Sequence, residues 1–101
     1  MKETFKADFE KAMNKLNEAQ KEANIIANKV FESIPNGTFI VPQTELYTNS
    51  NIYNDLCLIS EIMKEEDGSM YVRTEYDECI EIRELDDKWY NDVVIYLIEH
   101  L

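Results

Sequence analysis

The residues able to do chemistry are few, and they lie far apart in the chain. The sequence holds two cysteines, Cys57 and Cys79, and a single histidine, His100. A structural zinc site needs about four nitrogen or sulfur ligands, and a cysteine nucleophile needs a base held beside it. This set supplies neither arrangement. We therefore expect no catalytic residue, no metal site and no cofactor.

Paired carboxylates offer the one enzymatic hypothesis. Glu61 and Glu81 are expected to flank Arg73 on neighbouring strands. A guanidinium between two carboxylates holds their pKa values down, whereas a general acid needs a raised pKa. The arrangement therefore argues against a small carboxylate enzyme, and we expect a protein that is not an enzyme.

Acidic residues cluster near the predicted turns, and these clusters are candidate recognition surfaces. One cluster is expected at one end of the sheet and comprises Glu65, Glu66, Asp67, Glu84, Asp86 and Asp87. A second is expected at the other end and comprises Asp55, Glu75, Asp77 and Glu78. Runs of acidic residues are most often solvated surface. Their spacing matches no EF-hand loop, so a calcium site is not favoured.

The net charge of −11 is distributed unevenly. Residues 1–34 carry six lysines and six acidic residues, so they are neutral overall. Residues 35–101 carry four basic and fifteen acidic residues, so they hold the whole excess. This part would be repelled by nucleic acid and by anionic membranes, so we expect no direct nucleic-acid binding and no membrane binding. No apolar run approaches the roughly 20 residues of a membrane span, and a cytoplasmic protein is expected.

Residues 4–34 are predicted to form one long helix, with Thr4 as its N-cap and Pro35 ending it. Its apolar residues alternate in steps of four and three, as in a coiled coil. At about 1.5 Å per residue this helix is roughly 45 Å long, more than a compact domain of this size can cover. One interpretation is a single amphipathic helix laid across the sheet. The length instead favours an overhang, which would need a partner helix or a break near Asn24. The apolar positions, called the seam below, are Phe5, Phe9, Ala12, Leu16, Ala19, Ala23, Ile26 and Val30.

Residues 56–85 read as a three-stranded antiparallel meander. A loop of residues 66–68 pairs Ile62 with Val72, Glu61 with Arg73 and Leu58 with Tyr76. A second loop of residues 76–78 pairs Val72 with Ile82 and Arg73 with Glu81. One face then collects the apolar residues Leu58, Ile62, Met70, Val72, Tyr76, Ile80 and Ile82. Cys57 and Cys79 lie on the outer strands, about 9–10 Å apart, too far for a disulfide, so reduced thiols are expected.

The remaining segments complete an α+β fold. Residues 38–41 suit a short edge strand closed by Pro42, and residues 43–55 a loop with a brief extended piece at 46–47. A helix should start after Asp86 as N-cap and run to the C-terminus, with Ile95 and Tyr96 widening its apolar arc. The expected single domain, 1–101, comprises a long helix at 1–34, an antiparallel sheet of three to four strands at 37–85, and a C-terminal helix at 86–101.

The sequence does not identify the activity, and two functions remain open besides the enzyme. The first, which we favour, is a protein-interaction module acting through helix packing as a homodimer. Its candidate residues are Phe5, Phe9, Leu16, Ile95 and Tyr96. The alternative is an acidic inhibitor or nucleic-acid mimic that presents its carboxylates to a basic protein.

Overall fold

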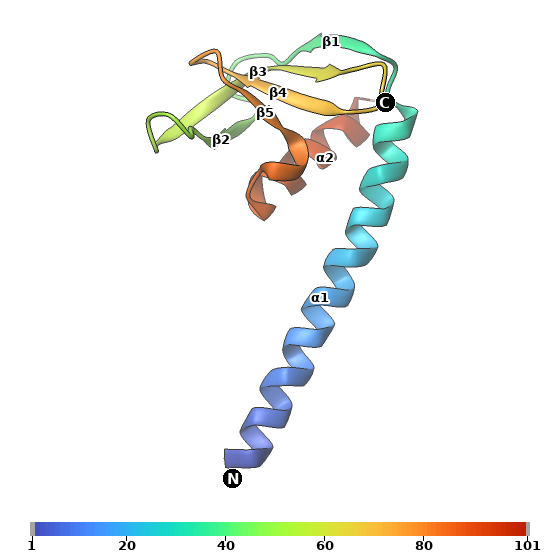
Figure 1. Ribbon diagram of the computed structural model, residues 1–101, viewed down its shortest axis with the longest axis vertical. Coiled ribbons are helices and arrows are strands. Elements are labelled where there is room, and N and C mark those ends of the chain that lie inside the picture. Colours follow the sequence, from blue (N-terminus) through green and yellow to red (C-terminus); the bar gives the residue numbers. More distant parts are fainter. Residues whose placement is uncertain (1, 101) are drawn as a thin grey trace.

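The computed structural model describes residues 2–100, with the side chains of residues 2, 3, 13, 16 and 17 left aside. It confirms the α+β fold: a long N-terminal helix, an antiparallel sheet and a C-terminal helix (Figure 1). The elements in chain order are α1 (Lys2–Ser33), β1 (Gly37–Ile40), β2 (Tyr47–Asn49), β3 (Leu56–Lys64), β4 (Met70–Thr74), β5 (Cys79–Glu81), the 3-10 turn η1 (Ile82–Glu84) and α2 (Asp87–Glu99).

The sheet is built around β3, its longest strand. On one side β3 pairs with β4, which in turn pairs with β5. On its other side β1 pairs with the second half of β3 and β2 with the first half. The segment expected to be a loop at residues 43–55 thus contributes a strand. Its extended piece is at Tyr47–Asn49 rather than at 46–47, because its backbone pairs with β3.

Both helices lie on the same face of the sheet, the face that collects its buried apolar side chains (Figure 1). The core lies between that face, α2 and the last turns of α1 (Figure 1). Its most buried side chains include Ile59, Ile62 and Val72 from the sheet, Val93 from α2 and Ala27 from α1. We call this unit, residues 27–100, the head.

A β-bulge at Ser60 corrects part of the predicted register. Ile62 pairs with Val72 and Glu61 with Arg73 as expected, but Ile59 then pairs with Thr74, which leaves Ser60 unpaired. A bulge reverses the faces of the residues on its far side, which here are those before Ser60. Cys57 and Ile59 are therefore buried instead of Leu58, which is half-buried.

The second predicted loop was also wrong. Thr74 pairs with Glu78 around residues 75–77, and Asp77 takes the left-handed conformation with φ 65°. Tyr76 therefore lies exposed in the turn and not in the strand. β5 is displaced by two residues, so Val72 pairs with Ile80 and Glu81 lies opposite Tyr71. A shift of two residues keeps each side chain on its expected face.

The helix ends follow the expected signals in part. α1 starts at Lys2, so Thr4 lies inside it, and it continues through Asn24 without a break up to Ser33, two residues before Pro35. Lys64 of β3 binds the C-terminal end of α1: Nζ donates to Phe31 O in the last turn and to Ile34 O just after the helix, at 2.7 Å each. At α2 the N-cap is Asp86, as predicted, but its side chain makes no capping hydrogen bond.

Candidate interaction surface

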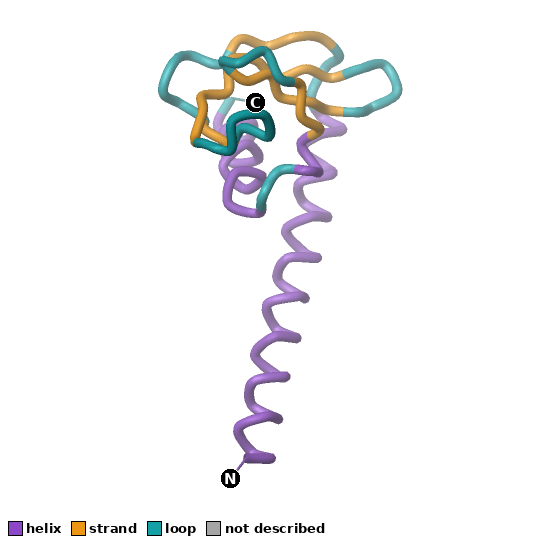
Figure 2. The backbone as a smooth tube through the Cα atoms, turned by 60° about the vertical axis from the view of Figure 1, so that its left-hand side comes forward, coloured by secondary structure: helices purple, strands orange, loops and turns teal. Residues whose placement is uncertain are grey.

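The first half of α1 projects away from the head (Figure 2). The chain measures 54 × 32 × 23 Å, with a radius of gyration of 16.5 Å. A compact chain of 100 residues has a radius of gyration of about 13 Å, so the molecule is elongated. We call residues 2–19 the arm; at about 1.5 Å per residue the arm is about 27 Å long. Every arm side chain that the structure describes is exposed.

The seam residues of the arm are uncovered apolar surface. Phe5 is 68% exposed and Phe9 67% exposed, and further along the seam Ile26 is 56% exposed. Leu16 lies on the same line of positions, but its side chain is outside those described. Burial begins at Ala27, which is 1% exposed.

Packing against the head does not account for the stability of the exposed arm. Isolated helices of this length are marginally stable in water, and most helical stability comes from packing of an apolar face. The arm does have local support, from a Lys6–Glu10 pair at 4.0 Å. An exposed pair of this kind contributes only about 0.3–0.5 kcal/mol. Two exposed phenylalanines one turn apart are therefore a candidate contact surface.

On α2 the two candidate residues differ in position. Ile95 is 53% exposed and lies on the outer side of the helix. Tyr96 is half-buried and packs against the core, and burial raises the pKa of its phenol. Its ring stacks on His100, with ring centroids 4.1 Å apart. Ile95 is thus accessible to a partner, whereas much of the Tyr96 side chain packs against the core of the head.

The first acidic cluster is not brought together. Glu65, Glu66 and Asp67 form the β3–β4 turn, where Ser69 N donates to Asp67 Oδ1 at 2.9 Å and lowers the pKa of that carboxyl. Asp86 instead accepts from Asn49 Nδ2 at 3.2 Å, and Asn49 pairs with Leu56 at the opposite end of β3. Asp86, at the N-cap of α2, therefore lies away from that turn.

The second acidic cluster does gather at one end of the sheet, but its members have different partners. Asp55 accepts a hydrogen bond from Tyr76 OH at 3.5 Å. The Tyr76 ring packs edge-on against the ring of Tyr53, with ring centroids 4.7 Å apart. Partial desolvation, with the charges of Asp55 and Glu75, raises the pKa of the Tyr76 phenol. Asp77 pairs with Arg73 at 2.8 Å, and Arg73 also pairs with Glu61 at 3.1 Å.

Glu78 has a structural role that the sequence did not reveal. It is 8% exposed and accepts hydrogen bonds from Ser50 Oγ at 2.6 Å and Asn51 N at 2.9 Å. Ser50 Oγ in turn accepts from the backbone N–H groups of Ile52 and Tyr53. A buried carboxylate thus holds the 50–55 loop against the β4–β5 turn. Nothing in the spacing of Ser50 and Glu78 predicts this contact.

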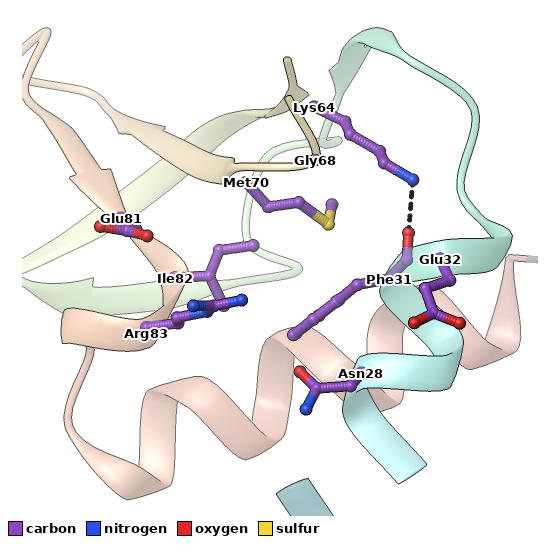
Figure 3. Close-up of a pocket in the computed structure, with 9 residues that line it drawn as sticks. All are labelled: Asn28, Phe31, Glu32, Lys64, Gly68, Met70, Glu81, Ile82 and Arg83. Carbon is purple, nitrogen blue, oxygen red and sulfur yellow. Dashed lines mark hydrogen bonds between the residues drawn. The ribbon is translucent and has the colours of Figure 1, made fainter. Parts of the chain in front are cut away.

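A hollow between α1 and the sheet mixes apolar and charged groups (Figure 3). Phe31 extends from α1 and Met70 from β4 into it, while Lys64 reaches the carbonyl of Phe31. Glu32 and Glu81 lie at its edges with Arg83, so its charges are balanced. The ammonium of Lys64 is already engaged by two carbonyls, which leaves the hollow no assembled anion site.

The described residues do not assemble a metal centre. Within residues 2–100 no group of three or more histidine, cysteine, aspartate or glutamate side chains is placed to hold a metal ion. In the same part of the chain, no helix has the length and apolar character needed to cross a membrane.

Comparison with known proteins gave no match. No protein-family model matches the chain, and neither the curated proteins nor the solved structures include a significant match.

Proposed function

We propose that this protein is a non-enzymatic interaction module that associates with a second copy of itself through the seam of α1. The observation that carries the proposal is the exposed arm: Phe5 and Phe9 are about two-thirds exposed on a helix that the head does not cover. Burying apolar area is the main favourable term in most protein association. A neutral arm on a head with a charge of −11 also offers the surface where two copies repel least.

The second candidate function is an acidic inhibitor or nucleic-acid mimic with a basic protein partner. The observation that favours it is the charge of residues 35–101, which hold all of the net −11. Against it, the acidic groups are divided between two ends of the sheet, and several of them have partners within the chain.

Light scattering coupled to size exclusion tests the first proposal. The wild-type chain should have twice the monomer mass of 11.9 kDa at micromolar concentration. Phe9→Ser should shift it towards monomer, because an anchor of the seam is lost. Ile52→Ser is the matched control, since Ile52 is similarly exposed, at 65%, but lies in a loop of the head.

The outcomes separate the two functions. A wild-type mass that stays monomeric as the concentration rises would contradict self-association through α1. Equal loss of mass in both variants would point to a surface other than the seam. Capture of a basic protein that weakens with added salt would favour the acidic inhibitor.

A further inference from the structure

We infer that the two copies of α1 pair antiparallel, in one register that sets Phe9 of one copy opposite Ile26 of the other. This inference rests on the proposed self-association and specifies its geometry. It comes from the seam positions, from the charges that flank them and from the side of α1 that the head leaves free.

The seam matches itself end to end in a single antiparallel alignment. Its residues alternate between the a and d positions of a heptad, and antiparallel helices pack a against d. When Phe9 meets Ile26, Ala12 meets Ala23 and Leu16 meets Ala19. Phe5 then reaches the level of Val30, which is already buried in the core of the head at 8% exposed, so the seam contacts end at Phe9 and Ile26. Each central contact thus includes at least one alanine, which lets the helices approach closely, and Phe9 with Ile26 forms the outer contact.

The flanking charges agree with this alignment. The g positions beside the seam hold Asp8, Lys15, Glu22 and Lys29, all of them exposed. Antiparallel helices bring g positions of the two copies together. In this register Asp8 faces Lys29 and Lys15 faces Glu22, and each pair occurs twice by symmetry. All of these contacts are attractive, and charged flanking pairs set helix orientation in coiled coils.

The other arrangements lack this complementarity. A slip of one heptad in one direction sets Asp8 against Glu22 and Lys15 against its own copy. A slip in the other direction sets Lys15 against Lys29 and Glu22 against its own copy. Every one of these contacts is repulsive. A parallel pair places g beside e positions, and e positions 13, 20 and 27 carry no charge.

The head leaves the complementary flank of α1 free. At the level where α1 enters the head, Ala27 on the e side is 1% exposed, whereas Ile26 is 56% exposed. Glu22 and Lys29, on the g side, are both exposed. A second helix can therefore lie along the d and g side. An antiparallel pair also sets the two acidic heads at opposite ends, where their repulsion is smallest.

An apolar groove begins where the seam ends. Ser33 continues the line of Ile26, one heptad further on, and it lines a groove with Phe39, Ile40 and Tyr96. No acidic residue lines this groove. In the antiparallel register the start of α1 of the second copy comes to the level of Ser33, beside this groove.

Disulfide trapping tests the orientation directly. We would make Ala12→Cys and Ala23→Cys separately, each with Cys79→Ser, and oxidise each variant alone and then an equal mixture. In the inferred register position 12 of one copy lies against position 23 of the other. Two copies of position 12 lie about 17 Å apart along the axis, too far for a disulfide. Only the mixture should therefore form cross-linked dimers. Lys21→Cys, on the outer face, gives the background rate.

Each outcome decides the inference. Rapid cross-linking of Ala12→Cys alone would show parallel helices and overturn it. No cross-linking in any sample, with a wild-type chain that is dimeric by light scattering, would overturn this register but leave the proposed function standing. A monomeric wild-type chain would overturn both.

A charge exchange gives an independent readout that does not need cysteines. Asp8→Lys and Lys29→Glu should each weaken self-association by about tenfold, because two attractive pairs become repulsive. The double variant should recover wild-type affinity, since the pairs are restored with opposite polarity. If self-association of the double variant is instead weakened by the sum of the two single effects, the register would be contradicted. Glu18→Lys and Lys21→Glu, away from the seam, are the controls.

Discussion

Glu78 shows how one buried carboxylate fixes a loop that the sequence leaves undefined. Its oxygens bind Ser50 Oγ and Asn51 N, at 2.6 and 2.9 Å. Glu78→Ala should leave these donors unpaired and lower the free energy of unfolding by about 1–3 kcal/mol. Urea denaturation measures the change, and Glu75→Ala, at an exposed position of the same turn, is the control. Equal stability of the two variants would contradict the role given to Glu78.

The two thiols should differ in reactivity. Cys57 is buried, and burial, followed by the charges of Glu78 and Glu75, raises the pKa of its thiol. Cys79 is exposed on β5, at the edge of the sheet, whereas Cys57 lies on the central strand β3. Because the thiolate is the reactive form, iodoacetamide should label Cys79 first in the native protein. Both thiols should label after denaturation without reductant, as mass spectrometry would show. Faster native labelling of Cys57 would contradict the burial described here.

Lys64 joins the sheet to the end of α1. Its ammonium donates to the carbonyl of Phe31, in the last turn of that helix, and to the carbonyl of Ile34 just after it. Lys64→Met keeps the length of the side chain but removes the donors, and should cost about 1–2 kcal/mol of folding free energy. Thermal unfolding compared with Arg83→Met, an exposed cation beside the same hollow, measures this cost. A larger effect of the Arg83 variant would contradict it.

The order of the elements could be predicted from the sequence, because periodicity and turn residues are local signals. The strand register could be predicted only as far as Glu61 and Arg73. Beyond them, the continuous apolar run Leu56–Ile59 has no alternation that could locate the bulge at Ser60. The second turn contains no glycine, so the left-handed Asp77 could not be recognised.

The candidate interaction surfaces could likewise be predicted only where they depend on local spacing. The heptad pattern of α1 predicted the overhang, since it depends only on spacing within one helix. The grouping of Glu65, Glu66 and Asp67 with Asp86 was wrong, because it depended on where η1 turns the chain after β5. Contacts between distant segments, such as Ser50 with Glu78, leave no local pattern to detect.

At the scale of the whole molecule, the net charge lies in the head, whereas the proposed association surface lies on α1. Reversing Glu66, Asp67, Asp86 and Asp87 to Lys adds two charges at each position and changes the net charge from −11 to −3. Self-association should persist in this variant, because none of the four residues lies on the seam. Light scattering at low and high salt measures it. Loss of the dimer would contradict a role for α1 as the association surface, and loss of a basic partner alone would favour the inhibitor.

The most direct test of association through α1 is hydrogen exchange of the arm amides as a function of protein concentration. If two copies pack along the seam, amides of residues 5–23 should be protected at high concentration. On dilution they should lose that protection, while the amides of β3 keep theirs, since association depends on mass action and the fold of the head does not. Arm amides that exchange rapidly and at the same rate at every concentration would contradict the proposal.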